Sequence, residues 1–206
     1  MSTETATTER LHAPSKGLAW LLIGFGLLGW IAAFALTLER FHVAANPNEA
    51  LSCDLNIFIS CKSVMLTAQS AIFGFPNPLI GLSAFVAPIL VGFAVLAGGR
   101  FAEWFWRMFM AGLSLGLLFV VWLSSQSIFV INVLCPYCIV AWLAMIPLFW
   151  HALLWMLKED IIQGPASWAD FFDAAYKRAW LFPLGTELLI VLLIVIQFWS
   201  YWPTMF

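Results

Sequence analysis

The sequence predicts an all-α integral membrane protein, in which a four-helix transmembrane bundle is joined by a fifth transmembrane helix. Of the 206 residues, 63% are hydrophobic and only 10% are charged, whereas the surface of a soluble globular domain needs far more charge. Five stretches are also long and apolar enough to cross the hydrocarbon core, for which a helix needs about 20 residues. We therefore expect membrane lipid around the protein and no nucleic acid partner.

The five apolar stretches follow one another along the chain. They cover residues 18–38, 79–96, 108–130, 139–157 (opening at a Cys-Pro-Tyr-Cys motif) and 187–202. The first is longer than the ~7–15 apolar residues of a secretory signal peptide and lacks its small-residue cleavage site, so we expect it to be retained. One membrane domain results. Its parts are a tail (1–17), a four-span core (18–157), a loop (158–185) and the fifth span (186–206).

The distribution of Lys and Arg predicts the orientation, because short loops rich in these residues stay in the cytoplasm. One side is expected to hold Arg10, Lys16, Arg100, Arg107, Lys158, Lys177 and Arg178, and the other only Arg40 and Lys62. The N-terminus is therefore predicted to be cytoplasmic, in a multi-pass protein of the cell inner (plasma) membrane. All four cysteines then face the extracytoplasmic side, where disulfides form and persist.

Two connecting segments are expected to contain short helices. The outer segment, 39–78, has an amphipathic stretch over 63–75 that could lie over the bundle as a lid, and prolines at 76 and 78 then start the second span. On the inner side an interfacial helix is expected, capped by Ser167. Its apolar residues recur at helical spacing and are Trp168, Phe171, Phe172, Ala175, Ala179 and Trp180.

The cysteines form two pairs. Cys135 and Cys138 belong to the Cys-Pro-Tyr-Cys motif, whose spacing is typical of a redox-active dithiol at the start of a helix. Pro136 suits the first helical turn, and a helix N-terminus stabilises a thiolate. Cys138 is then expected to lie one turn inside the fourth span, facing a membrane-soluble acceptor. Cys135 stays nearer the loop, where it can exchange with the other pair, Cys53 and Cys61.

Plainer interpretations of these residues stay open. Cys135 and Cys138 could be two unreactive buried thiols, and all four cysteines could bind zinc, although the first pair is spaced more widely than zinc ligands usually are. Cys53 and Cys61 could form a static disulfide that fixes the lid, worth about 2–3 kcal/mol. We favour a shuttle, because a static bridge would leave the dithiol without an aqueous partner.

In their order along the chain, these motifs resemble the vitamin K epoxide reductase family in its bacterial form. The resemblance covers about residues 18–157. It rests on the Cys-x₇-Cys pair between the first two spans, an Asn within Phe-Gly-Phe-Pro-Asn-Pro at 73–78, and the Cys-x-x-Cys that opens the fourth span. Disulfide bond formation protein B, another quinone-coupled oxidase, has its Cys-x-x-Cys in the first external loop, so the motif order argues against it.

The resemblance implies a four-helix bundle around a quinone of the menaquinone or ubiquinone type. Cys53 would receive electrons from a protein partner, Cys61 would exchange with Cys135, and Cys138 would reduce the quinone. Some bacterial members carry a fused thioredoxin-like domain after a fifth helix, whereas this chain has that helix and then ends. The expected partner is therefore a separate extracytoplasmic DsbA-like protein of the thioredoxin fold, in which the relay generates disulfides.

Two further residues are expected at the quinone beside Cys138. Asn77 matches the family asparagine that hydrogen-bonds a quinone carbonyl, although from the sequence alone it is equally a turn residue between two prolines. Trp142 stands where the mammalian enzyme has a substrate-contacting tyrosine. This departure weakens the case for epoxide reduction and leaves quinone reduction intact.

Two hypotheses of a different class remain. A non-enzymatic membrane subunit would use its cysteines only to brace external loops, and a metal-binding membrane protein would use them as ligands. The favoured hypothesis, a quinone-dependent thiol oxidoreductase, involves no metal.

Overall fold

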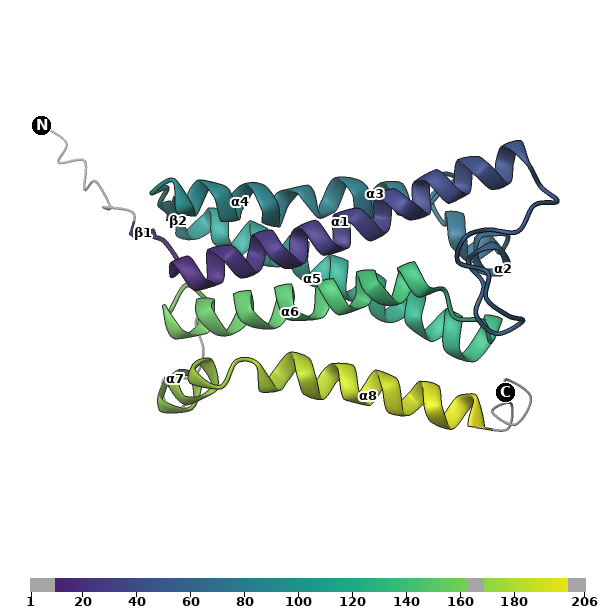
Figure 1. The fold of residues 1–206 in the computed structure, drawn as a ribbon. Coiled ribbons are helices and arrows are strands. Elements are labelled where there is room, and N and C mark those ends of the chain that lie inside the picture. The colour runs from purple at the N-terminus through teal and green to yellow at the C-terminus, as the bar shows by residue number, and fades with distance from the viewer. Residues whose placement is uncertain (1–9, 163–168, 200–206) are drawn as a thin grey trace, which may run out of the picture.

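The computed structural model describes residues 10–162 and 169–199, whose long helices run side by side (Figure 1). Four helical spans have the length and hydropathy needed to cross a membrane. They are Lys16–Ala45 (α1), Pro78–Leu96 (α3, Pro78–Ala84, and α4, Val86–Leu96), Glu103–Ile131 (α5, Glu103–Ser125, and the π-helical turn η2, Gln126–Ile131) and Pro136–Lys158 (α6). The predicted all-α, multi-pass membrane bundle is confirmed.

Helix α1 is longer than the predicted span 18–38 at both ends. It begins after Ser15, whose hydroxyl accepts a hydrogen bond from the backbone N–H of Leu18, and it continues to Ala45. The helix can extend beyond the apolar residues because its backbone hydrogen bonds are made within the helix, whether the surroundings are lipid or water. Beyond that boundary, Arg40 donates to the carbonyl of Met65, which ties the end of α1 to the lid.

Small residues let α1 pack closely against the second span, which is interrupted at Phe85 between α3 and α4. A Cβ at Gly29 would lie 2.4 Å from the Phe85 ring, and one at Gly92 would lie 2.7 Å from the carbonyl oxygen of Ala19. Close backbone approach at glycine is typical of helix packing in membranes. Helix α6 packs against the other side of α1, so α1 lies at the centre of the four-span core.

The lid contains a short helix, α2 (Cys61–Met65), and one turn of 3-10 helix, η1 (Ala68–Ala71). The expected lid helix is therefore present, but it begins at Cys61 because the hydroxyl of Ser60 caps the backbone N–H of Ser63. At the opposite end of the bundle, a two-residue strand in the N-terminal tail, β1 (Leu11–His12), pairs with β2 (Phe101–Ala102).

The fifth predicted helix begins earlier than expected. Helix α8 runs from Leu181 to Gln197 rather than over 187–202, since Pro183 fits the first turn and the apolar run already begins at Leu181. Residues 200–202 lie outside the described part of the chain. By itself α8 is shorter than the four spans above, and it qualifies as a fifth only together with α7 (Ala169–Lys177), from which it bends by 69°.

Helix α7 forms where the sequence predicts an interfacial helix, and its place at the membrane interface stays a prediction. Its predicted cap Ser167 and the first apolar residue, Trp168, lie outside the described residues. Ala175 and Ala179 are buried against Leu154 of α6, while Phe171 is exposed. The apolar spacing seen in the sequence therefore marks a face that is only partly covered by protein.

Candidate redox site

A short backbone pairing brings the two cysteine-bearing segments together. The N–H of Leu134 donates to the carbonyl of Phe58 (2.8 Å), and the N–H of Ser60 donates to the carbonyl of Leu134 (3.0 Å). These two bonds form a parallel bridge between Ile59 and Leu134. Because Cys61 follows Ser60 and Cys135 follows Leu134, the pairing places one cysteine of each pair side by side.

All four cysteines lie at this end of the bundle. Cys53 and Cys61 form a disulfide with their Cα atoms 5.7 Å apart, whereas Cys135 and Cys138 are free thiols. The Cys135 sulfur lies 3.3 Å from the Cys61 sulfur, within the range of about 3–3.5 Å for reacting atoms. Both of these sulfurs are buried, with residue exposures of 1% and 0%. The structure therefore holds a disulfide and a dithiol in contact, shielded from water.

The start of α6 stabilises a thiolate at Cys135, which lies just outside the span. Cys135 is the N-cap, its sulfur accepts the backbone N–H of Cys138 (3.4 Å), and Pro136 occupies the first turn as predicted. The hydrogen bond from the Cys138 thiol lowers the pKa of Cys135 most, and the N–H groups of Cys138 and Tyr137 lower it further. Burial and the Asp54 carboxylate raise this pKa, but the net shift is downward.

Asp54 holds the disulfide loop in shape, a role that sequence reasoning missed. One carboxylate oxygen accepts the N–H of Leu51 (2.9 Å), and the other accepts the hydroxyl of Ser60 (2.8 Å) and the N–H of Lys62 (3.1 Å). Burial raises the pKa of Asp54, but these bonds and one from the N–H of Cys61 lower it below its ordinary value. The sequence signal that could have indicated this role is that Asp54 directly follows Cys53, while Ser60, a helix-capping residue, directly precedes Cys61.

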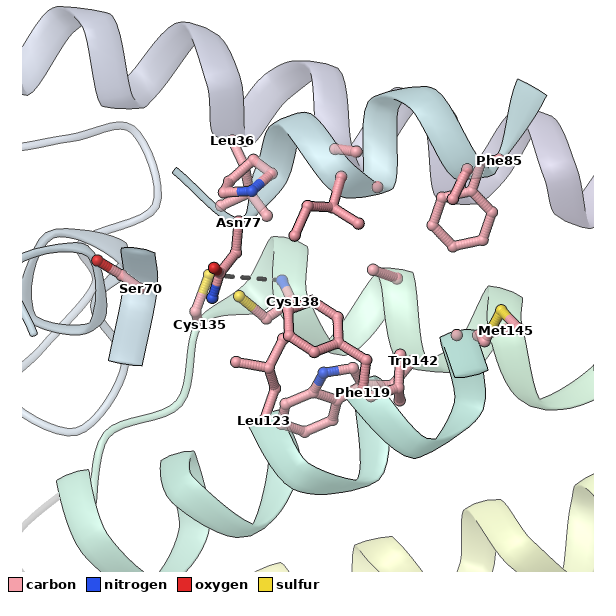
Figure 2. Close-up of a pocket in the computed structure, with 18 of the residues that line it drawn as sticks. Leu36, Ser70, Asn77, Phe85, Phe119, Leu123, Cys135, Cys138, Trp142 and Met145 are labelled. Carbon is pink, nitrogen blue, oxygen red and sulfur yellow. Dashed lines mark hydrogen bonds between the residues drawn. The ribbon is translucent and has the colours of Figure 1, made fainter. Parts of the chain in front are cut away.

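An apolar cavity of about 400 Å³ opens from the cysteines into the bundle, and Figure 2 shows part of its lining. Its walls come from α1, α3, α4, α5 and α6, and the lid closes its outer end. Cys135, Cys138 and Asn77 lie together at that end in Figure 2, with Trp142 and Phe119 along one wall. The lining is almost wholly apolar, which suits a flat, lipid-soluble molecule rather than a charged one.

Asn77 is 7% exposed and already has partners inside the lid. Its side-chain N–H₂ donates to the carbonyl of Gln69 (2.7 Å), and its side-chain oxygen accepts the N–H of Ile72 (3.3 Å). Through these bonds Asn77 stabilises the turn, which is one of the two roles that the sequence allowed for it. One N–H of the amide is still available, since the group carries two donors.

Trp142 lines the cavity one turn of α6 beyond Cys138 and is 4% exposed. Its indole N–H has no hydrogen-bond acceptor among the described residues. The indole N–H can therefore donate to an oxygen of a molecule bound in the cavity. The structure thus brings the predicted residues Asn77, Cys138 and Trp142 to one cavity.

Two of the four sulfurs are joined in a disulfide and are not available as thiolate ligands. Within residues 10–162 and 169–199, no group of three or more His, Cys, Asp or Glu side chains is placed to hold a metal ion.

Comparison with known protein families gives a match. The sequence model described as the vitamin K epoxide reductase family matches residues 20–153, a stretch that contains all four cysteines, Asn77 and Trp142. Among curated proteins no match is found.

Proposed function

Since the chain belongs to the vitamin K epoxide reductase family, a family of membrane thiol oxidoreductases, we propose that it oxidises the thiols of a protein partner and passes the electrons to a membrane quinone. The observation that carries the proposal is the 3.3 Å contact between the Cys61 and Cys135 sulfurs, where a disulfide meets a dithiol at the mouth of an apolar cavity. A static brace of the loop would not need a second pair of thiols in contact with it.

The first step takes place at the Cys53–Cys61 disulfide. A thiolate of the partner attacks the Cys53 sulfur and releases Cys61, and the partner's second thiol then displaces Cys53 and closes a disulfide in the partner. The partner loses two electrons and two protons, and the loop pair gains them. Among the two loop cysteines Cys53 is the better point of entry, because it is 5% exposed whereas Cys61 is fully buried against Cys135.

The second step is sulfur exchange between the pairs. The Cys61 thiolate attacks the Cys135 sulfur of a Cys135–Cys138 disulfide and releases the Cys138 thiolate; Cys53 then attacks Cys61 and releases Cys135. The products are a Cys53–Cys61 disulfide and two free thiols at the start of α6. These products match the state of the cysteines in the structure.

The residues around the cavity fit a quinone. When bound, a quinone accepts two electrons and two protons and becomes a quinol. Cys135 and Cys138 both line the cavity, and Cys138 would re-form its disulfide with Cys135 as two electrons and two protons leave the pair. The Trp142 N–H, which lacks an acceptor, and the second N–H of Asn77 would hold the ring oxygens, where negative charge develops during reduction.

The test is quinone reduction by the purified full-length protein in lipid nanodiscs, with a reduced DsbA-like protein as electron donor and a short-chain quinone as acceptor. We expect turnover in the wild type and none with Cys138→Ser, because serine forms neither a thiolate nor a disulfide at neutral pH. Leu192→Ala, on the exposed side of α8, is the matched control. Full activity of Cys138→Ser would overturn the proposal.

The extracytoplasmic partner and the face of the membrane are tested separately. In Cys61→Ser the loop keeps only Cys53. When this variant is oxidised together with a partner whose second redox cysteine is replaced by serine, Cys53 should form a stable mixed disulfide with it, because neither pair keeps the thiol that would resolve the bond. Recovery of a thioredoxin-fold protein by this bond from the extracytoplasmic side supports the proposal. Recovery only from the cytoplasmic side would overturn the predicted orientation.

A further inference from the structure

Helix α8 lies outside the residues matched by the family model, yet its outer end reaches the redox site. Figure 1 shows α8 beside α6, with its C-terminal end at the same end of the bundle as α2. At its inner end α8 is attached to α6: the indole N–H of Trp150 donates to the hydroxyl of Thr186 (3.0 Å), and the Trp150 ring lies 5.2 Å from that of Phe182. Helix α8 is thus held in place at a distance from the cysteines.

The outer end of α8 packs beneath the bridge that joins the two cysteine segments. Phe198 is 2% exposed and forms a buried cluster with Leu134 and Ile128. Its ring centroid lies 6.2 Å from that of Phe58 in an edge-to-face arrangement. Phe58 and Leu134 supply backbone groups to the bridge, together with Ser60, so the side chain that caps α8 lies against both strands of the bridge.

A second contact fixes the turn that leads into Leu134. The side-chain N–H₂ of Gln197 donates to the side-chain oxygen of Asn132 (3.0 Å). Asn132 ends the π-helical turn in the left-handed region, with φ of 56°, a conformation that Asn adopts more readily than most residues and that contacts of its side chain help to hold. Gln197 supplies such a contact from α8.

We propose that Phe198 and Gln197 are positioning residues for sulfur exchange, holding the Ile59–Leu134 bridge closed so that the Cys61 and Cys135 sulfurs stay in contact. The bridge itself consists of two backbone hydrogen bonds, and a hydrogen bond adds little net stability when water can replace it. The buried Phe198 ring excludes water from one side of the bridge and makes its opening costly. This inference rests on the proposed function, because it assigns a purpose to the exchange between the pairs.

The test measures the sulfur contact directly, without quinone or partner. In full-length protein carrying Cys53→Ala and Cys138→Ala, only Cys61 and Cys135 can pair, and the fraction paired is titrated against glutathione buffers and read by alkylation and mass spectrometry. The titration gives a reduction potential, which a role limited to general stability would leave unchanged. We expect Phe198→Ala to lower the equilibrium constant for the Cys61–Cys135 disulfide about tenfold.

Three further variants make the outcome decisive. Phe198→Leu should keep most of the effect by filling the same space, and Gln197→Leu should lower the constant about threefold by releasing Asn132. Ile196→Ala, a neighbouring residue of α8 that is 63% exposed, should leave the constant unchanged. If Phe198→Ala does not yield folded protein, Gln197→Leu against Ile196→Ala decides the question.

The result is separable from that of the proposed function. A potential that is equal in Phe198→Ala, Gln197→Leu and Ile196→Ala overturns the positioning role, whether or not the wild type turns over quinone. A wild type without quinone turnover overturns the proposed function, while a tenfold change in the sulfur equilibrium would still support the positioning role.

Discussion

The two cysteine pairs touch each other but are held in different ways. The loop pair, Cys53 and Cys61, is closed by a disulfide and shaped by side chains, above all by the Asp54 carboxylate. The helix pair, Cys135 and Cys138, is set by the backbone of α6 and faces an apolar cavity. The difference fits the proposed function, in which the loop pair would meet a soluble protein and the helix pair a lipid-soluble molecule.

The largest expected effect comes from separating the two pairs. Cys135→Ser removes the sulfur that contacts Cys61, so electrons should enter the loop pair and stop there. Thiol-driven quinone reduction should fall at least about a hundredfold, as it does when one member of a catalytic unit is lost. Alkylation and mass spectrometry should then find Cys53 and Cys61 reduced by the donor. Unchanged quinone turnover would show that the pairs do not act in series.

A smaller effect is expected from loosening the loop pair alone. Asp54→Asn keeps the shape of the side chain but offers only one carbonyl oxygen to the N–H groups of Leu51 and Lys62 and the hydroxyl of Ser60. We expect partner-driven turnover to fall about tenfold, through loss of charge-assisted hydrogen bonds.

The same variant should shift the pH dependence at the helix pair. The Asp54 carboxylate raises the pKa of Cys135, so its removal should move that pKa further down, which rapid alkylation of Cys135 against pH would measure. Asn56→Ala, in the same loop, is the control for loop disturbance. Equal alkylation profiles in wild type and Asp54→Asn would count against electrostatic coupling between the pairs.

In the cavity next to the helix pair, Trp142→Phe tests whether the indole N–H contributes to quinone binding. Phenylalanine keeps the ring in the wall but removes the indole N–H that has no acceptor among the described residues. We expect the KM for quinone to rise about threefold to tenfold, the worth of one neutral hydrogen bond, with turnover at saturating quinone little changed. Phe119→Leu, on the same wall, controls for packing; an equal rise in KM there would remove the specific role of the N–H.

The smallest effect concerns stability at low pH. The folded-state pKa of Asp54 is lowered from its ordinary value of 3.8, so the stability it contributes is fully present above pH 3.8 and is lost as the pH falls through the lower, folded-state pKa. Tm should therefore fall more steeply in the wild type than in Asp54→Asn across this acid range. We expect a small difference, because the carboxylate is only partly shielded from water. Parallel Tm curves would contradict the prediction.

Much of the fold could be predicted because its signals are local. Apolar runs of membrane length identified four spans, and the order of these spans placed all four cysteines at one end of the bundle. The Cys-Pro-Tyr-Cys motif predicted a helix start, with Pro136 in the first turn. Element ends were predicted less well: α1 and α8 begin or end away from the apolar boundaries, since caps and prolines set helix ends as much as hydropathy does.

The candidate site was predicted only in part. Its cysteines were found from spacing, but Asp54 was missed because a carboxylate in a polar loop has no distinctive pattern until its donors are placed around it. The structure shows Asn77 bonded within the lid, a role that the sequence could not separate from quinone binding. Trp142 was predicted from the family resemblance. That its N–H has no acceptor among the described residues could be seen only once the structure placed the neighbouring side chains around it.

By itself the sequence determined that this protein is a helical membrane protein with two thiol pairs at one end, because composition and helical length act residue by residue along the chain. Only the tertiary structure decided that Cys61 meets Cys135, that a cavity begins there, and that the end of α8 packs under the bridge between them. The reason is physical: the two sulfurs in contact are 74 residues apart, and their distance is set by loop hydrogen bonds and ring packing between segments that no local pattern connects.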